Sequence, residues 1–205
     1  MRIGIVRSEA TVSSERLIKK ELSDIGVDVF YVSPKIKEKT ADCILVFGGD
    51  RGIRTYFHHA LNTETPVLGI SESESNGFLA QIDLKEMISY LQRIKKQDYV
   101  IENVPRIGVK IDGKSTYPVL NDVAVFASKS ATLVEYILRI NGEEVWHDSS
   151  DGIIVSTPIG SSAYSMSAGG PVIFQNSDVF GIISVNSLDV IRRPLIVPND
   201  SKIEI

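Results

Sequence analysis

The run Cys43-Ile44-Leu45-Val46-Phe47 most constrains the fold of this chain, because all five of its side chains are apolar. A strand exposed on one face alternates polar and apolar residues, whereas an uninterrupted apolar strand is typical of a parallel sheet that is covered on both faces. Gly48-Gly49-Asp50 follows directly and ends the strand. We therefore expect this strand, residues 42–47, to lie inside a parallel sheet.

Strand and helix patterns alternate around this run, as in a sheet with crossover helices. The predicted strands are 3–6, 27–32, 42–47 and 66–70, and the predicted helices cover Ser13 to Ile25, 53–61 and 84–96. After Tyr99 the pattern changes to short strands, predicted at 105–111, 115–120, 123–127, 132–140, 143–146 and 153–155. Asp112-Gly113 and Asn141-Gly142 are strong signals for tight hairpin turns. The predicted fold class is α/β: a Rossmann-like parallel sheet domain over 1–100, followed by a β-rich, β-sandwich-like domain over 101–205.

Composition narrows the range of partners. The 205 residues carry a formal net charge of −4, so no broad basic field favours nucleic acid or an anionic membrane. No stretch approaches the roughly 20 apolar residues of a spanning helix, and the first residues do not form a signal peptide, so we expect a cytoplasmic protein. The single cysteine, Cys43, cannot form an intrachain disulfide, and its apolar neighbours indicate a buried thiol.

Gly48-Gly49-Asp50 is the first candidate for chemistry. In open α/β sheets, ligands bind beyond the carboxyl ends of the strands. Two glycines let backbone amides approach a phosphate at the start of the next helix, and Asp50 would be placed to take a proton. A turn with a helix-capping aspartate explains these three residues equally well.

Two further segments are polar where apolar residues surround them. Asn121-Asp122 interrupts an apolar run, either as a bulge or exposed edge, or as an amide and a carboxylate aimed into a cleft. The segment Asp151–Pro171 begins as a strand, is stopped by Thr157-Pro158, and continues with small residues around Tyr164. A flexible loop has such a composition, but the preceding strand and acidic residue favour close approach of a polar ligand. Ser161 and Ser162 have no histidine nearby in sequence, so a hydrolase triad is unsupported.

Taken in order along the chain, these segments resemble the NAD kinase family. Gly48-Gly49-Asp50 looks like its Gly-Gly-Asp-Gly motif, and Leu120–Val123 looks like its Asn-Glu motif. Asp151–Pro171 is similar, almost residue for residue, to the family's long Asp-Gly to Gly-Gly-Pro segment, and Arg193–Pro198 resembles its Arg-Pro segment. The long segment is the specific one, because Gly-Gly-Asp also occurs in lipid kinases and phosphofructokinases.

The resemblance implies phosphorylation of the 2′-hydroxyl of the adenosine ribose of NAD, with a site between two domains. ATP or polyphosphate would be the donor, with Mg²⁺ or another divalent cation held through the donor's phosphates rather than by protein ligands. A homo-oligomer, dimer or tetramer, is also implied. The implied roles are Asp50 as the catalytic acidic residue near the 2′-hydroxyl; Gly48, Gly49, Arg51 and Gly52 as the ATP phosphate loop; Phe78 near the adenine; Asn121 and Asp122 at the adenosine; Asp151 at the nicotinamide side, from a neighbouring subunit; and Ser162, Ala163, Tyr164 and Ser167 lining the NAD site.

The sequence departs from the family pattern at three of these places. Arg51 replaces a glycine, Asp122 is one methylene shorter than the usual glutamate, and Ile159 replaces a hydroxyl residue. The departures at Arg51 and Ile159 favour an alternative function, that of a non-catalytic NAD(P)-binding homologue with a sensing or regulatory role. An acyl-lipid or sugar kinase is disfavoured by the specificity of residues 151–171.

Overall fold

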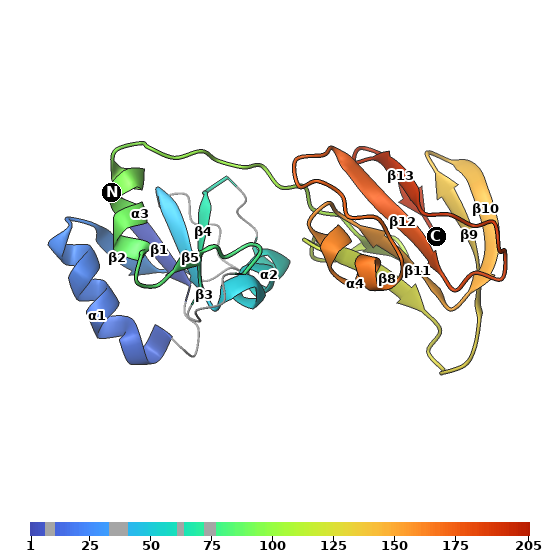
Figure 1. The fold of residues 1–205 in the computed structure, drawn as a ribbon, viewed down its shortest axis with the longest axis horizontal. Coiled ribbons are helices and arrows are strands. Elements are labelled where there is room, and N and C mark those ends of the chain that lie inside the picture. Colours follow the sequence, from blue (N-terminus) through green and yellow to red (C-terminus); the bar gives the residue numbers. More distant parts are fainter. Residues whose placement is uncertain (7–10, 33–40, 61–63, 72–76) are drawn as a thin grey trace. The chain divides into compact units, whose positions relative to one another are not determined.

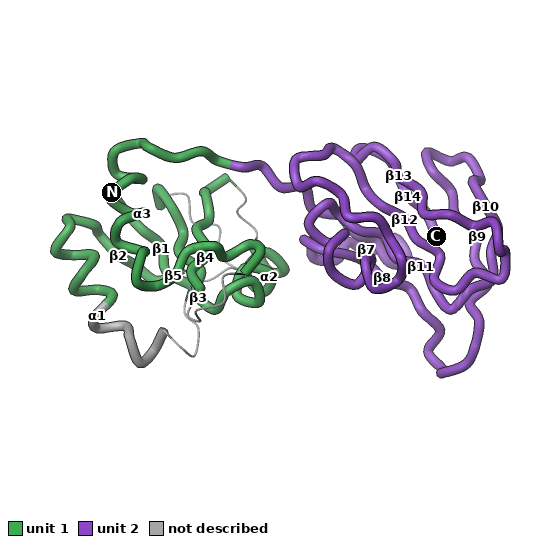
Figure 2. The backbone as a smooth tube through the Cα atoms, viewed as in Figure 1, with its two compact units in different colours: residues 1–101 green, residues 102–205 purple. Residues whose placement is uncertain are grey.

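The structure, a computed structural model, describes residues 1–6, 11–32, 41–60, 64–71 and 77–205, with only the backbone described for 11–17. The chain divides into two compact units, Met1–Ile101 and Glu102–Ile205 (Figure 2). Within the described residues, no helix is long and apolar enough to cross a membrane. Two segments whose composition is typical of surface loops, a basic turn at 34–40 and all but the first residue of a polar, acidic stretch at 71–76, lie outside the described residues.

A five-stranded, all-parallel sheet forms the centre of the first unit (Figure 1). Its order is β2-β1-β3-β4-β5, with β1 Arg2–Val6, β2 Asp28–Tyr31, β3 Cys43–Phe47, β4 Val67–Ser71 and β5 Ile82–Asp83. The apolar run Cys43–Phe47 is the middle strand, β3, and all five of its residues are buried. The predicted parallel sheet is confirmed.

Helices cover both faces of this sheet. One face packs against α1 (Thr11–Asp24) and α3 (Met87–Lys95) in a core that includes Ile3, Leu45, Leu22 and Leu91. The opposite face meets α2 (Gly49–His59), where Ile53 is buried over Gly69. A Cβ at Gly69 would overlap Cδ1 of Ile53, so the glycine lets α2 pack closely on β4 with Ile53 in this position.

The starts of all three helices in this unit were predicted wrongly, that of α1 by two residues, because it begins at Thr11 rather than Ser13. α2 begins at Gly49, four residues before the predicted start, and Asp50 and Arg51 are therefore helical. Sequence reasoning treated Gly48-Gly49-Asp50 as a loop, but only Gly48 and Gly49 have positive φ, 94° and 62°. α3 begins at Met87 rather than Leu84, because Asp83 accepts a hydrogen bond from the amide of Lys85 in a preceding turn.

The second unit is a sandwich of two antiparallel sheets and a small hairpin. One sheet has the order β13-β12-β11-β8, and the other has the order β10-β9-β14. The bounds are β6 Lys110–Ile111, β7 Lys114–Ser115, β8 Asp122–Phe126, β9 Val134–Ile140, β10 Glu143–Ser150, β11 Gly152–Ser156, β12 Val179–Val185, β13 Leu195–Pro198 and β14 Ile203–Glu204. The predicted β-rich second domain is confirmed.

Side chains from both sheets share one core. Leu138 and Trp146 come from the three-stranded sheet, and Ile153, Val155 and Ile182 come from the four-stranded sheet. Both predicted hairpin turns are present, since Asp112-Gly113 and Asn141-Gly142 all have positive φ, as a type I′ turn requires.

Several strand predictions in this unit were wrong in extent. In place of the strands predicted at 105–111 and 115–120, the chain forms only the two-residue strands β6 and β7 at 110–111 and 114–115, with an isolated bridge between Ile107 and Val119. β10 continues to Ser150 past the predicted end at Trp146, because the polar residues 147–150 still pair with β9. Strands β12, β13 and β14 were not predicted.

Candidate functional site

The Gly48-Gly49 turn is the first part of the candidate site, and it lies in the first unit. It connects the carboxyl end of β3 to α2, with Gly48 at the N-cap in the left-handed conformation. A Cβ on Gly49 would meet no atom within 4 Å. The glycine is thus needed for its backbone conformation, and the space beside it is open to a ligand.

Asp50 lies directly after this turn, in the first turn of α2, and its carboxylate accepts hydrogen bonds from three consecutive backbone amides. Oδ2 accepts from Phe78 N, and Oδ1 accepts from Leu79 N and Ala80 N, each at 2.9 Å. Gly77 permits this approach, since a Cβ there would lie 2.1 Å from Oδ1 of Asp50. A carboxylate has about four acceptor positions, so these bonds fix its orientation and leave room for one more donor.

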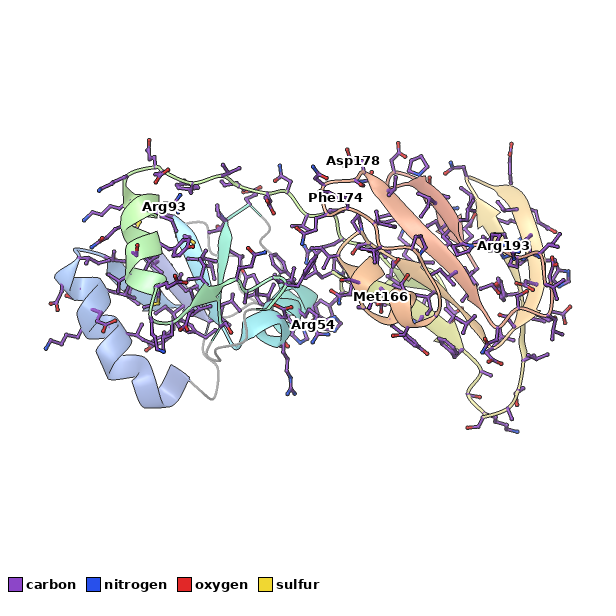
Figure 3. All side chains as sticks on the ribbon, viewed as in Figure 1. Arg54, Arg93, Met166, Phe174, Asp178 and Arg193 are labelled. Carbon is purple, nitrogen blue, oxygen red and sulfur yellow. The ribbon has the colours of Figure 1, made fainter. Side chains whose placement is uncertain are left out.

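Arg51 and Gly52 differ in their surroundings. Arg51 is exposed on α2 with an ordinary helical backbone, so its side chain is accommodated without strain. Arg54 lies on the same helix (Figure 3) and is exposed, and its Nε donates to the Asp50 carbonyl oxygen at 3.4 Å. Gly52 has a packing reason to be glycine, because a Cβ would lie 2.1 Å from the carbonyl oxygen of Phe47.

The second part of the candidate site lies in the second unit, where Asn121 directly precedes the edge strand β8 and Asp122 is its first residue. Thr157 N donates to the Asn121 carbonyl (2.8 Å), and Thr157 Oγ1 donates to the Leu120 carbonyl (2.6 Å). Gly160 packs so closely that a Cβ would lie 2.0 Å from the Asn121 carbonyl oxygen. The side-chain Oδ1 of Asn121 is buried and has no hydrogen-bond partner within the described part of the chain.

The small residues after β11 divide into structural and accessible ones. Ser161 is buried and accepts from Ile173 N at 2.8 Å, while Ser165 is buried against Ser156, which donates to it at 3.3 Å. They fix this segment, which includes α4 (Tyr164–Ser167), on the four-stranded sheet. The predicted ligand-lining residues are the less buried ones: Ser162, Ala163, Tyr164 and Ser167.

Tyr164 stacks on Phe126 of β8, with ring centroids 5.7 Å apart and an interplanar angle of 21°. Sequence reasoning did not single out Phe126, and no local signal would have, because the pairing joins residues 38 positions apart (164 − 126). Ile159 is buried, so an apolar side chain packs at the position where the family has a hydroxyl residue.

Asp151 directly precedes β11, and its backbone amide donates to the Val185 carbonyl at 2.9 Å. Its Oδ2 accepts a hydrogen bond of 2.7 Å from Nδ2 of Asn186. Asn186 was not predicted as a site residue, although an asparagine directly after an apolar strand is a turn signal that would have drawn attention to it.

A buried polar cluster lies three residues before Asp151, at Asp148. Its carboxylate accepts from Ser184 Oγ (2.6 Å), Ser187 Oγ (2.7 Å) and Ser149 N (2.8 Å), and lies 3.4 Å from Nε of Arg192. Burial pushes the pKa of Asp148 upward, but these hydrogen bonds and the guanidinium charge outweigh it, so the pKa lies below its ordinary value. Sequence reasoning missed this cluster entirely.

Within the first unit, the structure brings together Gly48, Gly49, Asp50 and the segment that contains Phe78. Within the second, it brings Asn121 and Asp122 beside the segment at 157–160, and Tyr164 against β8. The described residues contain no group of three or more histidine, cysteine, aspartate or glutamate side chains arranged to hold a metal ion.

Comparison of the sequence with known proteins identifies the family to which the chain belongs. The profile of the ATP-NAD kinase N-terminal domain matches residues 5–99, and that of the ATP-NAD kinase C-terminal domain matches residues 120–205. An NAD kinase of Clostridium botulinum (strain Loch Maree / Type A3) is 33% identical over 198 residues, covering 92% of this chain and 69% of that protein. The chain belongs to the NAD kinase family. The predicted family and the predicted enzyme class, a kinase, are thereby confirmed.

Other relatives extend this result. An NAD kinase of Methanopyrus kandleri is 32% identical over 174 residues, 85% of this chain and 63% of that protein. The crystal structure of an NAD kinase from Archaeoglobus fulgidus in complex with ATP superposes with a TM-score of 0.81 at 28% identity, covering 99% of this chain and 79% of that one. A yeast NADH kinase complexed with NADH shares the fold, with a TM-score of 0.75 at 21% identity over 99% of this chain and 71% of that one.

Proposed function

We propose that this member of the NAD kinase family transfers a phosphoryl group from ATP or polyphosphate to the 2′-hydroxyl of the adenosine ribose of NAD, giving NADP. Membership of the family supports the reaction, and the ATP complex of the Archaeoglobus fulgidus relative supports ATP as one donor. The observation that carries the proposal is the Asp50 carboxylate, fixed by three amides directly after an open glycine turn.

Asp50 is the residue we assign to proton transfer. The ribose hydroxyl oxygen forms a bond to the terminal phosphorus while the bond from that phosphorus to the donor's leaving oxygen breaks. The hydroxyl proton passes to the remaining acceptor position of the carboxylate at a late stage. The amides of Phe78, Leu79 and Ala80 keep the carboxylate oriented through this step.

The donor's phosphates are assigned to the start of α2. Amides of Gly48 and Gly49 can approach an anion closely, and the helix dipole favours negative charge at this end. The exposed guanidinium of Arg51 would add a cation beside them, and Gly52 holds the turn against β3. Mg²⁺ or another divalent cation, bound through the donor's phosphate oxygens, would offset their charge.

NAD is assigned to the accessible polar residues of the second unit and to Phe78. The buried Oδ1 of Asn121 needs a donor, because an unsatisfied buried acceptor costs about 1–3 kcal/mol. A nucleoside hydroxyl or amine would satisfy it, with Asp122 beside it. Asp151 would receive a donor from the nicotinamide side, and the remaining lining residues are Ser162, Ala163, Tyr164 and Ser167.

The alternative, a non-catalytic NAD(P)-binding homologue, rested on Arg51 and Ile159. Arg51 is exposed on a regular helix, so it need not obstruct the glycine turn. Ile159 is buried within the folded segment, so apolar packing stands where the family has a hydroxyl. Both observations favour the kinase over the binding homologue.

The test is NADP formation by the purified protein with NAD, Mg²⁺ and either ATP or inorganic polyphosphate, read by an NADP-specific dehydrogenase. We expect NADP with at least one donor and none without a donor. Measurable NAD binding without NADP formation under either condition would instead support the non-catalytic homologue.

Assembly and location remain predictions. A homo-oligomer, dimer or tetramer, is expected from the family and can be measured by light scattering on an eluting column peak. The cytoplasmic location and the lack of nucleic-acid or membrane partners are likewise predicted from composition alone.

A further inference from the structure

The turn that follows β12 is unusual in both backbone and contacts. Asn186 has φ of 50°, a left-handed conformation that only glycine adopts routinely and asparagine tolerates. Its amide donates to Oδ2 of Asp151 at 2.7 Å. Asn186 is exposed, so neither burial nor core packing accounts for it.

The turn is anchored residue by residue to the segment that carries Asp151. Asn186 contacts Asp151, Ser187 Oγ donates to Asp148 (2.7 Å), and Leu188 N donates to the Ser149 carbonyl (3.0 Å). Three consecutive residues of the turn thus bond three of the four residues 148–151. The amide of Asn186 is therefore held in place by bonds that do not involve Asp151.

The chemistry of this contact is selective. The neutral side-chain amide of Asn186 fixes one carboxylate oxygen of Asp151 and leaves the negative charge in place, whereas an arginine would neutralise that charge. The second oxygen and the full negative charge remain for a ligand that donates hydrogen bonds, such as a carboxamide or hydroxyl group.

We propose that Asn186 is a positioning residue that orients the Asp151 carboxylate toward a hydrogen-bond donor of bound NAD. This inference rests on the proposed function, because Asp151 is there assigned to NAD. It predicts that Asn186 affects the affinity for NAD, through Asp151, and does not affect the rate of phosphoryl transfer.

The main variant is Asn186→Gly, which removes the amide and keeps a residue suited to positive φ. Asn141→Gly is the matched control: Asn141 also has positive φ (54°), in the hairpin turn that precedes β10, whereas Asp151 follows the other end of that strand. NAD affinity is measured by calorimetry on the full chain, and KM and kcat by NADP formation.

We expect Asn186→Gly to weaken NAD binding about three- to tenfold, the usual worth of one hydrogen bond, with kcat within about twofold of wild type. Asn141→Gly should leave NAD affinity unchanged. Asn186→Asp should weaken binding further than Asn186→Gly, and more so at low salt, because it sets two carboxylates side by side.

A double-mutant cycle separates positioning from a general structural role. In an Asp151→Asn background, Asn186→Gly should add less than about a twofold loss, since its target is already altered. Wild-type NAD affinity for Asn186→Gly, or an equal loss in both backgrounds, would overturn the inference alone. If the wild-type protein neither binds nor phosphorylates NAD, the proposed function fails, and this inference fails with it.

Discussion

The Asp148 cluster offers a sharp test of how the second unit is held together. The Asp148 side chain is 2% exposed, and it faces Arg192 (19% exposed) together with three donors at 2.6–2.8 Å. Removing one partner of a buried ion pair costs roughly 3–5 kcal/mol. Because Arg192 is partly hydrated and asparagine keeps one acceptor oxygen, we take the lower end, about 3 kcal/mol, for Asp148→Asn.

Trp146 provides the assay. It is the only tryptophan in the sequence, and the Arg192 guanidinium lies 4.7 Å from its ring centroid. Its fluorescence therefore reports unfolding at this cluster. With a typical urea slope of roughly 2 kcal/mol/M, the midpoint for Asp148→Asn should fall by about 1.5 M.

Asp178→Asn is the matched control, since Asp178 is exposed and accepts one bond of 3.3 Å from Asn199 (Figure 3). It should change stability by less than about 0.5 kcal/mol. A loss below about 1 kcal/mol for Asp148→Asn would refute the reasoning that this cluster is a major tie between the two sheets.

Three further predictions follow from local geometry. The pKa of Asp148 is lowered on folding, so its contribution is present at neutral pH and is lost as acid protonates the folded state. The stability difference between wild type and Asp148→Asn, measured by urea titration, should therefore shrink below about pH 4. Gly52→Ala should cost about 1–3 kcal/mol by urea unfolding, because its Cβ would meet the Phe47 carbonyl; a neutral substitution would contradict this packing. Burial raises the pKa of Cys43 to about 12, so an alkylating reagent should label it only after unfolding, and rapid labelling of the native protein would contradict its burial.

The sheet of the first unit could be predicted because its decisive signal is local. The apolar run at 43–47 requires burial on both faces, and only a covered parallel strand provides it. The start of α2 could not be predicted in the same way. Gly49 is a poor helix former, and the helix begins there because Asp50 is tied to residues 78–80, which are distant in sequence.

In the second unit, the tight turns were predictable and the strand lengths were not. Asn141-Gly142 specifies its turn through backbone conformation alone. The polar end of β10 gives no strand signal, since Asp148 is buried by partners from β12 and the following turn. Of the candidate site residues, those in motifs were found from sequence, whereas Phe126 and Asn186 depend on contacts between distant segments.

The central claim is that Asp50 accepts the proton during phosphoryl transfer to NAD. The most direct measurement compares NADP formation and NAD affinity for wild type, Asp50→Asn and the control Asp83→Asn, in which a carboxylate that accepts from Lys85 N is changed in the same unit. We predict that Asp50→Asn lowers kcat by at least about 100-fold while NAD affinity changes by less than about fivefold, and that Asp83→Asn stays near wild type. Undiminished turnover in Asp50→Asn with NAD bound would contradict the account.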